Sequence, residues 1–348
     1  MVILFEGFDN TGKTEISVEL AKRLDYSRYK DIREHECFNG KNEYLQELSL
    51  VYETYKTIAY LDQGIIQNLI LDRDYVSEYV YGRIFRPELY NKYECDKYVW
   101  KYDELFRLQD MHIIVCYKDK YKTFSDPVVN IDDKKKVVDG YLDFLSKTVN
   151  KTLLINTESE NLDEQISEIL KWLQKSKAIE SYNEKIYMEK SKDSNRIFFP
   201  GKFNGDKILF VGQNPGQPLP GDDFSKHLHT VKYDNFKQFM VDHNKSYNDS
   251  KYYNFLLKLT KELGLFPSDF SFTNVVKYST ANNRSLMTQE ITDGLEILKE
   301  QIEIFQPKVI ISFGVSAHKA LTELDIKHSP YYHPARYYYK TTHKIKEG

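Results

Sequence analysis

The chain has 348 residues, of which 41% are hydrophobic, and carries a formal net charge of −3. This length favours two domains, each with a packed core, over one domain or a disordered chain. The charge argues against a uniformly basic nucleic-acid-binding surface. The lack of a long apolar run predicts that no helix spans a membrane. The three scattered cysteines favour a reducing cytoplasm over a disulfide framework.

The first predicted strand leads into a phosphate-binding motif. Residues 2–5 (VILF) are apolar, residues 7–14 fit the pattern G-x-x-x-x-G-K-S/T, and the apolar stripe over 14–24 predicts a helix. In such loops main-chain N–H groups surround the phosphates of a nucleotide, the lysine reaches the β- and γ-phosphates, and the last hydroxyl binds Mg²⁺. The pattern therefore predicts ATP and Mg²⁺ as cofactors, with a nucleotide site formed by Gly7, Asn10, Thr11, Gly12, Lys13 and Thr14.

Strands and helices alternate through the rest of the first half. Apolar runs at 65–71, 111–116 and 153–156 predict strands, with a weaker candidate at 29–36, and helices are predicted at 42–62, 75–83, 87–108, 134–145 and 162–173. This alternation predicts an α/β fold with a parallel sheet covered by helices on both faces. Ligands of such sheets bind at the carboxyl ends of the strands, where residues 7–14 and Asp72-Arg73 both fall.

Two segments within residues 1–175 resemble the thymidylate kinases. Residues 5–14 (FEGFDNTGKT) are similar to the family's F-E-G-x-D-x-x-G-K-S/T opening, and residues 72–81 (DRDYVSEYVY) resemble its D-R-Y-x-x-S-x-x-A-Y segment. The resemblance implies that Asp9 faces the acceptor nucleotide, Asp72 helps to hold Mg²⁺ through water, and Arg73 binds the acceptor phosphate. Without the resemblance, Asp72 as a helix cap and Arg73 as a surface ion pair stay open as alternatives.

The segment that follows the predicted strand at 111–116 departs from this family. Thymidylate kinases carry an arginine-bearing lid there, whereas residues 118–132 contain Lys118, Lys120 and Lys122 but no arginine. An ammonium group cannot reproduce the bidentate contact of a guanidinium. We therefore expect the acceptor or the rate to differ from the family.

A change in composition separates the two halves. Residues 176–205 are rich in Lys, Ser, Glu and Asn and predict a linker or a peripheral helix and loop between domains at 1–175 and 206–348. Beyond it, strands are predicted at 207–212, 272–276 and 309–314, and helices at 252–263, 291–305 and 315–321. The second half is therefore also predicted to be an α/β domain.

Four segments of the second half resemble the uracil-DNA glycosylase superfamily. They are residues 212–216 (GQNPG), 273–277 (TNVVK) followed by 282–284 (NNR), the strand-helix step at 307–321, and 333–335 (HPA). Each is weak alone, but all four occur in the family's order. The absence of cysteine from this half means that the iron–sulfur cluster of the thermophile-type branch has no ligands here.

The resemblance assigns roles to residues of these segments. An asparagine amide both donates and accepts, so Asn274 matches O4 and N3–H of a flipped uracil, and His333 would donate to O2 as charge develops on the leaving base. Asn214 takes the water-positioning place, where an amide is a poor base, so slow or absent excision is expected. The predicted base-binding residues are Gln213, Gly216, Phe224 and Asn274, and the predicted catalytic residues of this half are Asn214 and His333.

Two interpretations of the whole chain stay open. In one, a kinase for a thymidine-type deoxynucleotide is fused to a domain that excises a uracil-type base from DNA. In the other, the kinase acts on a modified base such as 5-hydroxymethyluracil in DNA, and the second domain is a non-catalytic DNA reader. Gly216 stands where the fast uracil-specific branch has a tyrosine that blocks the pyrimidine C5, which favours a 5-substituted base. Four basic residues and three tyrosines in 336–346 favour DNA contact, and such a fusion is typical of a virus or mobile element.

Overall fold

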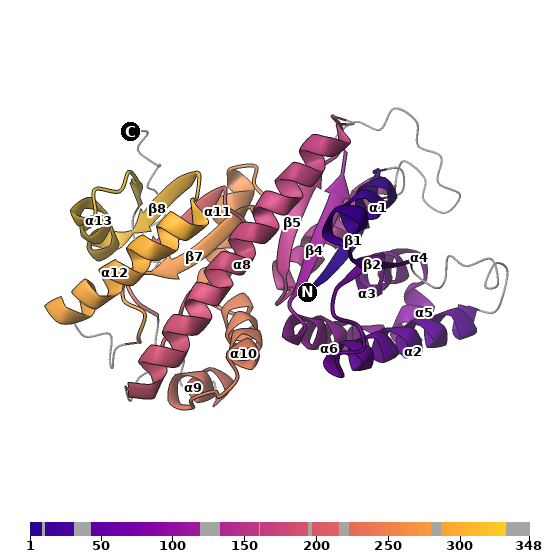
Figure 1. Cartoon of the computed structure of the whole chain (residues 1–348), viewed down its shortest axis with the longest axis horizontal. Coiled ribbons are helices and arrows are strands. Elements are labelled where there is room, and N and C mark those ends of the chain that lie inside the picture. The colour runs from indigo at the N-terminus through magenta and orange to yellow at the C-terminus, as the bar shows by residue number, and fades with distance from the viewer. Residues whose placement is uncertain are drawn as a thin grey trace. The chain divides into compact units, whose positions relative to one another are not determined.

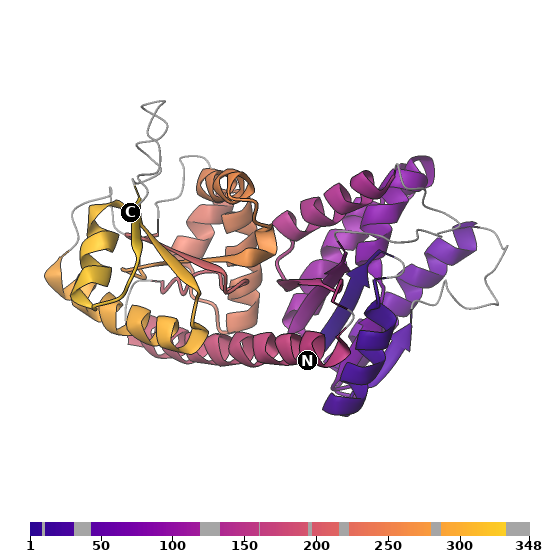
Figure 2. The same cartoon turned by 90° about the horizontal axis from the view of Figure 1, so that it is seen from above.

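The computed structural model describes residues 1–8, 11–30, 43–118, 133–159, 161–193, 197–215, 223–279 and 287–331. The chain divides into two compact units, Met1–Trp172 and Leu173–Gly348 (Figure 1). Each unit contains one parallel sheet with helices on both faces (Figure 2). The predicted α/β class is therefore confirmed for both halves. No helix within the described ranges is long and apolar enough to cross a membrane.

The sheet of the first unit has the strand order β2-β3-β1-β4-β5, and every neighbouring pair is parallel. The strands are β1 (Val2–Gly7), β2 (Ser27–Lys30), β3 (Leu69–Asp72), β4 (Met111–Tyr117) and β5 (Lys151–Asn156). Alternate residues face opposite sides. Val2 and Leu4 therefore belong to a core that also contains Ile58, Val99 and Val137 from the helices on one side of the sheet, whereas Ile3 and Phe5 are buried on the other side.

The helices of the first unit follow the predicted order, with two differences in detail. They are α1 (Lys13–Leu24), α2 (Glu43–Asp62), α3 (Tyr75–Ser77), α4 (Arg83–Phe85), α5 (Pro87–Lys92), α6 (Cys95–Leu108), α7 (Lys134–Lys147) and α8 (Leu162–Asp193). A π-helical turn, Glu78–Gly82, separates α3 from α4. The helix predicted over 87–108 is broken at Glu94, which has a left-handed φ of 50°. Strand β3 is shorter than predicted because residues 65–68 precede it without forming a strand.

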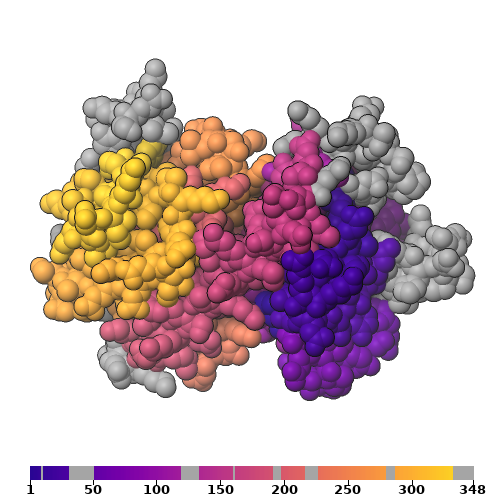
Figure 3. All heavy atoms as spheres, turned by 45° about the horizontal axis from the view of Figure 1, so that its top comes forward, coloured from indigo at the N-terminus to yellow at the C-terminus, as the bar shows by residue number. Residues whose placement is uncertain are grey.

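The sheet of the second unit has the order β7-β6-β8-β9, again with parallel neighbours. Its elements are β6 (Ile208–Gly212), α9 (Asp223–Thr230), α10 (Phe236–Asn248), α11 (Lys251–Glu262), β7 (Phe270–Asn274), α12 (Thr288–Phe305), β8 (Val309–Phe313), α13 (Gly314–Glu323) and β9 (Ser329–Tyr331). Helices α8, α12 and α13 cover one face of the sheet, and α11 covers the other. Helices α12 and α13 (orange to yellow) form much of the surface of this unit seen in Figure 3.

Helix α8 continues into the segment predicted as a linker. Its later residues Ile179 and Tyr187 are 1% exposed and belong to cores of the second unit. After the helix, Ile197, Phe198 and Phe199 are also buried. Where it is described, the segment 176–205 thus contributes apolar side chains to the second unit, which begins at Leu173.

Candidate functional sites

Both sheets reverse their direction of growth at a central strand, and each candidate motif follows that strand. In the first unit β1 lies between β3 and β4, and in the second unit β6 lies between β7 and β8. In open parallel sheets, ligands bind outside the carboxyl ends of the strands at such a reversal. Gly7 ends β1 and the described residues 11–14 come soon after it, while Gly212 ends β6 and residues 213–215 follow it. Both candidate motifs are therefore at the expected place for a ligand.

The loop after β1 has the backbone features of an anion site. Gly7 has a φ of 131°, and a Cβ there would lie 2.2 Å from the carbonyl oxygen of Cys116, so a side chain has no room. Gly12, with a φ of 75°, immediately precedes α1, and Lys13 is the first residue of that helix. The N–H groups of a helix N-terminus and its dipole favour a phosphate at this position. The Lys13 ammonium, 6% exposed, donates to the carbonyl oxygen of Phe8 at 3.1 Å, and the hydroxyl of Thr11 donates to the same oxygen at 2.7 Å.

The two residues predicted to bind magnesium are in direct contact. The hydroxyl of Thr14 donates to Oδ2 of Asp72 at 2.9 Å. The contact arises because Phe5 of β1 and Asp72 of β3 are partners in the parallel register, so both strands end at the same edge. A hydroxyl and a carboxylate fit Mg²⁺, which takes one or two protein oxygens and completes its shell with water and nucleotide phosphates.

A third residue at this position, Arg28 of β2, was not predicted from the sequence. Its guanidinium Nη2 donates to the same oxygen of Asp72, and its Nε donates to the hydroxyl of Ser17 at 2.8 Å. The Asp72 side chain is 1% exposed and that of Arg28 is 22% exposed. Arg28 therefore compensates the charge of a carboxylate that is otherwise withdrawn from water.

Replacing Arg28 with methionine is expected to lower the free energy of unfolding by roughly 1–3 kcal/mol. Loss of one partner from a buried pair costs about 3–5 kcal/mol, and the partial exposure of Arg28 reduces that cost. Urea unfolding of the full chain measures the change. In an Asp72→Asn background the same replacement is expected to cost much less, and an equal cost in both backgrounds would show that the ion pair is not its source.

Arg73 is held in an unusual conformation beside this site. Its φ of 68° is left-handed, which is uncommon for a residue other than glycine and is often found at functional sites. Its N–H donates to the carbonyl oxygen of Phe5 at 2.9 Å, and its guanidinium carbon lies 5.4 Å from the ring centroid of Tyr81. Tyr81 belongs to the π-helical turn, a rare element that is also frequent at functional sites.

Glu6, which was likewise not predicted, fixes the chain that follows Arg73. Its carboxylate is fully buried and accepts from the N–H groups of Asp74 and Ser77, at 3.0 and 3.1 Å, and from the hydroxyl of Ser77 at 2.6 Å. Burial raises the pKa of Glu6, although the Ser77 hydrogen bond and the positive charge of Arg73 act in the opposite direction. Glu6 thus links the end of β1 to the start of α3, immediately after Arg73.

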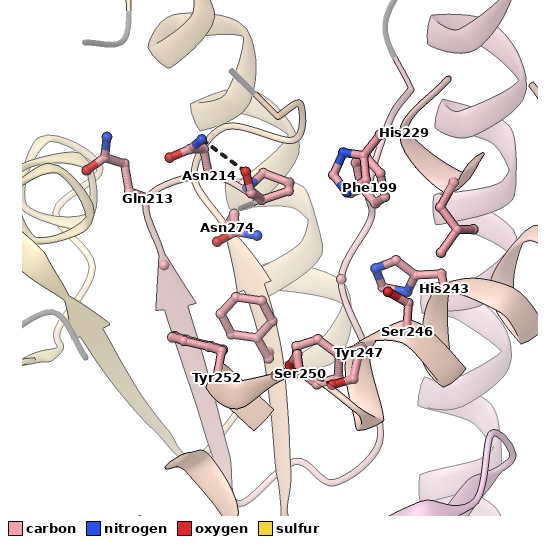
Figure 4. A pocket seen from close by; sticks show the side chains of 15 residues that line it. Phe199, Gln213, Asn214, His229, His243, Ser246, Tyr247, Ser250, Tyr252 and Asn274 are labelled. Atoms are coloured by element: carbon pink, nitrogen blue, oxygen red, sulfur yellow. Dashed lines mark hydrogen bonds between the residues drawn. The ribbon is translucent and has the colours of Figure 1, made fainter. Parts of the chain in front are cut away.

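A cavity of about 280 Å³ opens at the carboxyl ends of β6 and β7 in the second unit (Figure 4). Its described lining consists of Phe199, Gly201, Gly212, Gln213, Asn214, Pro215, Leu228, His229, His243, Ser246, Tyr247, Ser250, Tyr252, Phe272 and Asn274. None of these described lining residues is an aspartate, glutamate, lysine or arginine. Such a combination of aromatic rings, amides and hydroxyls suits a planar, uncharged polar ligand.

One wall of the cavity carries the predicted asparagines. Gly212 and Asn274 are register partners, and a Cβ on Gly212 would lie 2.5 Å from Oδ1 of Asn274, so glycine makes room for that amide. Two main-chain hydrogen bonds join the ends of the two strands. The N–H of Val275 donates to the carbonyl oxygen of Gly212, and that of Val276 donates to the carbonyl oxygen of Gln213, each at 2.9 Å. The Asn214 amide donates to the carbonyl oxygen of Pro215 at 3.1 Å (Figure 4).

The opposite wall is aromatic and includes two histidines. His229 and His243 lie across the cavity from Asn274, with the Phe199 ring beside them (Figure 4). The ring centroids of His243 and Phe239 are 5.7 Å apart, and those of His229 and Phe199 are 4.6 Å apart. Burial lowers the pKa of His243 to about 4, so the imidazole of His243 is uncharged near pH 7.

Comparison with known proteins identifies the region that holds this cavity. Residues 200–347 match the family model described as the uracil DNA glycosylase superfamily. The C-terminal region is a domain of this superfamily. A 69-residue segment is 39% identical to the type-4 uracil-DNA glycosylase of Pyrobaculum aerophilum and covers 20% of this chain and 35% of that protein. The chain therefore matches about a third of that relative's length.

A solved structure, that of the YorR protein of Bacillus subtilis in complex with phosphorylated GDP, is also similar to this chain. The similarity covers 49% of this chain and 94% of that one, with 19% sequence identity and a TM-score of 0.36. At this score the likeness supports no conclusion about fold or function.

Some predicted site residues of the glycosylase-superfamily domain lie close together, and others fall outside the residues that the structure describes. Gln213, Asn214 and Asn274 line one cavity. Phe224 lies in α9, but its side chain is outside the described part. Gly216 and His333, like Asp9 and Asn10 of the first unit, lie outside the described residues. Their assignments stay predictions.

Sequence reasoning missed the cavity residues contributed by α10, which are His243, Ser246 and Tyr247. Phe236, Phe239, His243 and Tyr247 follow one another at intervals of three or four residues, which is the pattern of one helical face. Asn235 precedes them and caps the helix by accepting from the N–H groups of Lys237 and Gln238. The spacing of the aromatic residues and the capping asparagine can both be found in the sequence of the glycosylase-superfamily domain, and together they predict α10. Neither shows that its aromatic face closes a cavity.

Proposed function

We propose that the protein is a bifunctional enzyme of nucleotide and DNA-base metabolism. Its first unit transfers a phosphoryl group from Mg–ATP to a thymidine-type deoxynucleotide, and its second unit binds a flipped uracil-type base of DNA and excises it slowly. Phosphoryl transfer depends mainly on positioning and charge neutralisation. The contact of Thr14 with Asp72, next to Lys13 and Arg73, supports the first activity because it gathers the groups that this chemistry needs.

The uncharged cavity at Asn274 supports the second activity. Glycosylases take a base out of the stack and read its Watson–Crick edge in a pocket. The Asn274 side chain, with one donor and one acceptor group, faces aromatic rings on which a base can stack. The relative from Pyrobaculum aerophilum is a type-4 uracil-DNA glycosylase, which agrees with uracil in DNA as the ligand.

A labelled-phosphate experiment tests the kinase assignment. The full chain is incubated with γ-labelled ATP, Mg²⁺ and a panel of deoxynucleoside monophosphates and DNAs that contain thymine, uracil or 5-hydroxymethyluracil. Label on a thymidine-type monophosphate supports the main proposal, and label on DNA supports a kinase that acts on a modified base. A chain that labels no acceptor in the panel contradicts the kinase assignment.

One observation favours a non-catalytic second unit as the alternative. Among the described residues that line the cavity there is no carboxylate to serve as a general base, and the resemblance assigns the water-positioning place to an amide, that of Asn214. In this alternative the domain is a DNA reader that presents a base to the kinase. Uracil-containing DNA that is bound, but yields no abasic site in prolonged incubation, supports the reader and excludes the glycosylase.

Gly216→Tyr tests whether the ligand carries a substituent at C5. We expect the wild type to bind DNA containing 5-hydroxymethyluracil as well as uracil, and the tyrosine to weaken only the former, by at least tenfold, because its ring blocks the C5 position. Competition binding with the two DNAs measures the ratio. Equal weakening of both, or a wild type without affinity for the 5-substituted base, contradicts this specificity.

A further inference from the structure

A lysine is buried directly behind the base-reading asparagine. Lys277 is 1% exposed, and its ammonium Nζ has three acceptors, each at 2.6 Å: the main-chain carbonyl oxygen of Asn274, the hydroxyl of Thr273 and Oε1 of Gln301. An ammonium group has three N–H donors and no acceptor. The three contacts therefore match its hydrogen-bonding capacity.

The same network joins four segments of the second unit. Nε2 of Gln301, on α12, donates to Oδ1 of Asn183 on α8 at 2.7 Å and to the carbonyl oxygen of Pro200 at 3.0 Å. The Thr273 hydroxyl lies 3.0 Å from that same carbonyl oxygen. Lys277 thus ties the carboxyl end of β7 to two helices and to the 200–201 segment at the cavity edge.

Lys277 is costly to bury, since the three groups that accept hydrogen bonds from its Nζ are uncharged. Burial lowers its pKa well below the ordinary value of a lysine. A well-packed apolar side chain is often at least as stabilising as a buried charged group. The geometry therefore indicates a role other than stability, and the contact with the main chain of Asn274 shows which residue the lysine holds in place.

Reading uracil requires an asparagine amide in one fixed orientation. Uracil presents the O4 acceptor and the N3–H donor, whereas cytosine presents an N4–H₂ donor and an N3 acceptor. An amide rotated by half a turn exchanges its donor and acceptor and matches cytosine instead. Discrimination between the two bases therefore depends on how firmly Asn274 is held, beginning with its main chain.

We propose that Lys277 is a positioning residue that fixes the main chain of Asn274 and thereby sets the preference of the cavity for uracil-type over cytosine-type bases. This inference rests on the proposed base-binding function of the second unit. Lys277 does not line the cavity among the described residues, so it acts through Asn274 and not by contact with the base.

The test compares the full chain with its Lys277→Met variant. Lys202→Met is the matched control, because Lys202 is another buried lysine of the same unit, 7% exposed, whose Nζ donates to Oδ1 of Asn248 at 2.6 Å. Fluorescence anisotropy measures the affinity of each protein for otherwise identical DNAs that carry one uracil or one cytosine at the probe position. Thermal unfolding reports whether each variant is folded.

We expect Lys277→Met to reduce the uracil-to-cytosine affinity ratio by about tenfold, the equivalent of roughly one hydrogen bond. Lys202→Met should leave the ratio unchanged. The ratio is informative because a fall in the folded fraction weakens both affinities equally and cancels. A folded Lys277→Met protein with the wild-type ratio overturns the inference.

Two further outcomes are decisive. If the wild type itself shows no preference for uracil, the proposed function of the cavity fails, and the inference fails with it. If Lys277→Met does not fold, Lys277→Leu, which also lacks a hydrogen-bond donor, takes its place in the comparison. An unchanged ratio in that variant overturns the role of Lys277 alone.

Discussion

Lys13→Ala is expected to reduce phosphoryl transfer by on the order of 10²-fold or more. The ammonium lies at the start of α1 beneath the loop that follows β1. Removing one preorganised group that stabilises developing charge costs about 10²- to 10³-fold in rate in other enzymes, and phosphoryl transfer relies largely on such groups. Transfer of label from γ-labelled ATP to the acceptor identified in the panel measures the effect.

Lys22→Ala is the matched control for this prediction. Lys22 lies on the same helix, its side chain is 71% exposed, and its Nζ is 3.7 Å from a carboxylate oxygen of Glu19. An exposed pair of this kind contributes little to stability, so we expect wild-type activity. If Lys13→Ala retains the activity of Lys22→Ala on every acceptor, the first unit is not a kinase that uses this loop.

The contact between Thr14 and Asp72 was predictable because it depends on the order of the strands and on the local sequence pattern. The apolar runs that end near Phe5 and Asp72 predict buried strands, and parallel strands bring their carboxyl ends to one edge of the sheet. In the second unit the same reasoning applies to Gly212 and Asn274, which end neighbouring strands in register. Residues that directly follow a buried strand can therefore be placed from the sequence.

Residues that reach the sites from weakly patterned segments could not be placed in this way. Strand β2, which carries Arg28, is mostly exposed, so it has no apolar alternation that would predict its pairing with β3. The π-helical turn at Glu78–Gly82 shifts the positions of Tyr79 and Tyr81 relative to an ordinary helix, and no residue pattern marks it. The aromatic wall of the cavity depends on how α10 packs against the sheet, which is a property of the whole fold.

The segment 176–205 shows a different limit of sequence reasoning. Its Lys, Ser, Glu and Asn content is typical of a solvent-exposed connection, and much of α8 is indeed polar. The few apolar residues among them, such as Ile179 and Tyr187, are nevertheless buried. Composition averages over both faces of a helix, whereas packing depends on one face only.

Asn274→Asp is expected to remove the preference of the second unit for uracil. The two side chains have nearly the same shape, but a carboxylate only accepts hydrogen bonds, so it repels O4 of uracil and can accept from N4 of cytosine. A reversed contact of this kind is worth about 1–3 kcal/mol, or on the order of 10- to 100-fold in the affinity ratio. Anisotropy with the uracil and cytosine DNAs measures this ratio in the full chain.

Two companion variants make the result specific to Asn274. Asn274→Ala removes both hydrogen-bonding groups, so we expect it to weaken uracil binding without any gain for cytosine. Asn254→Ala, on the exposed face of α11, changes an asparagine of the same unit away from the cavity and should behave as the wild type. Because Asp and Ala differ in their effect on cytosine, direct reading of the base edge is separable from a general loss of DNA affinity. A uracil preference that survives both substitutions at position 274 would show that another residue reads the base.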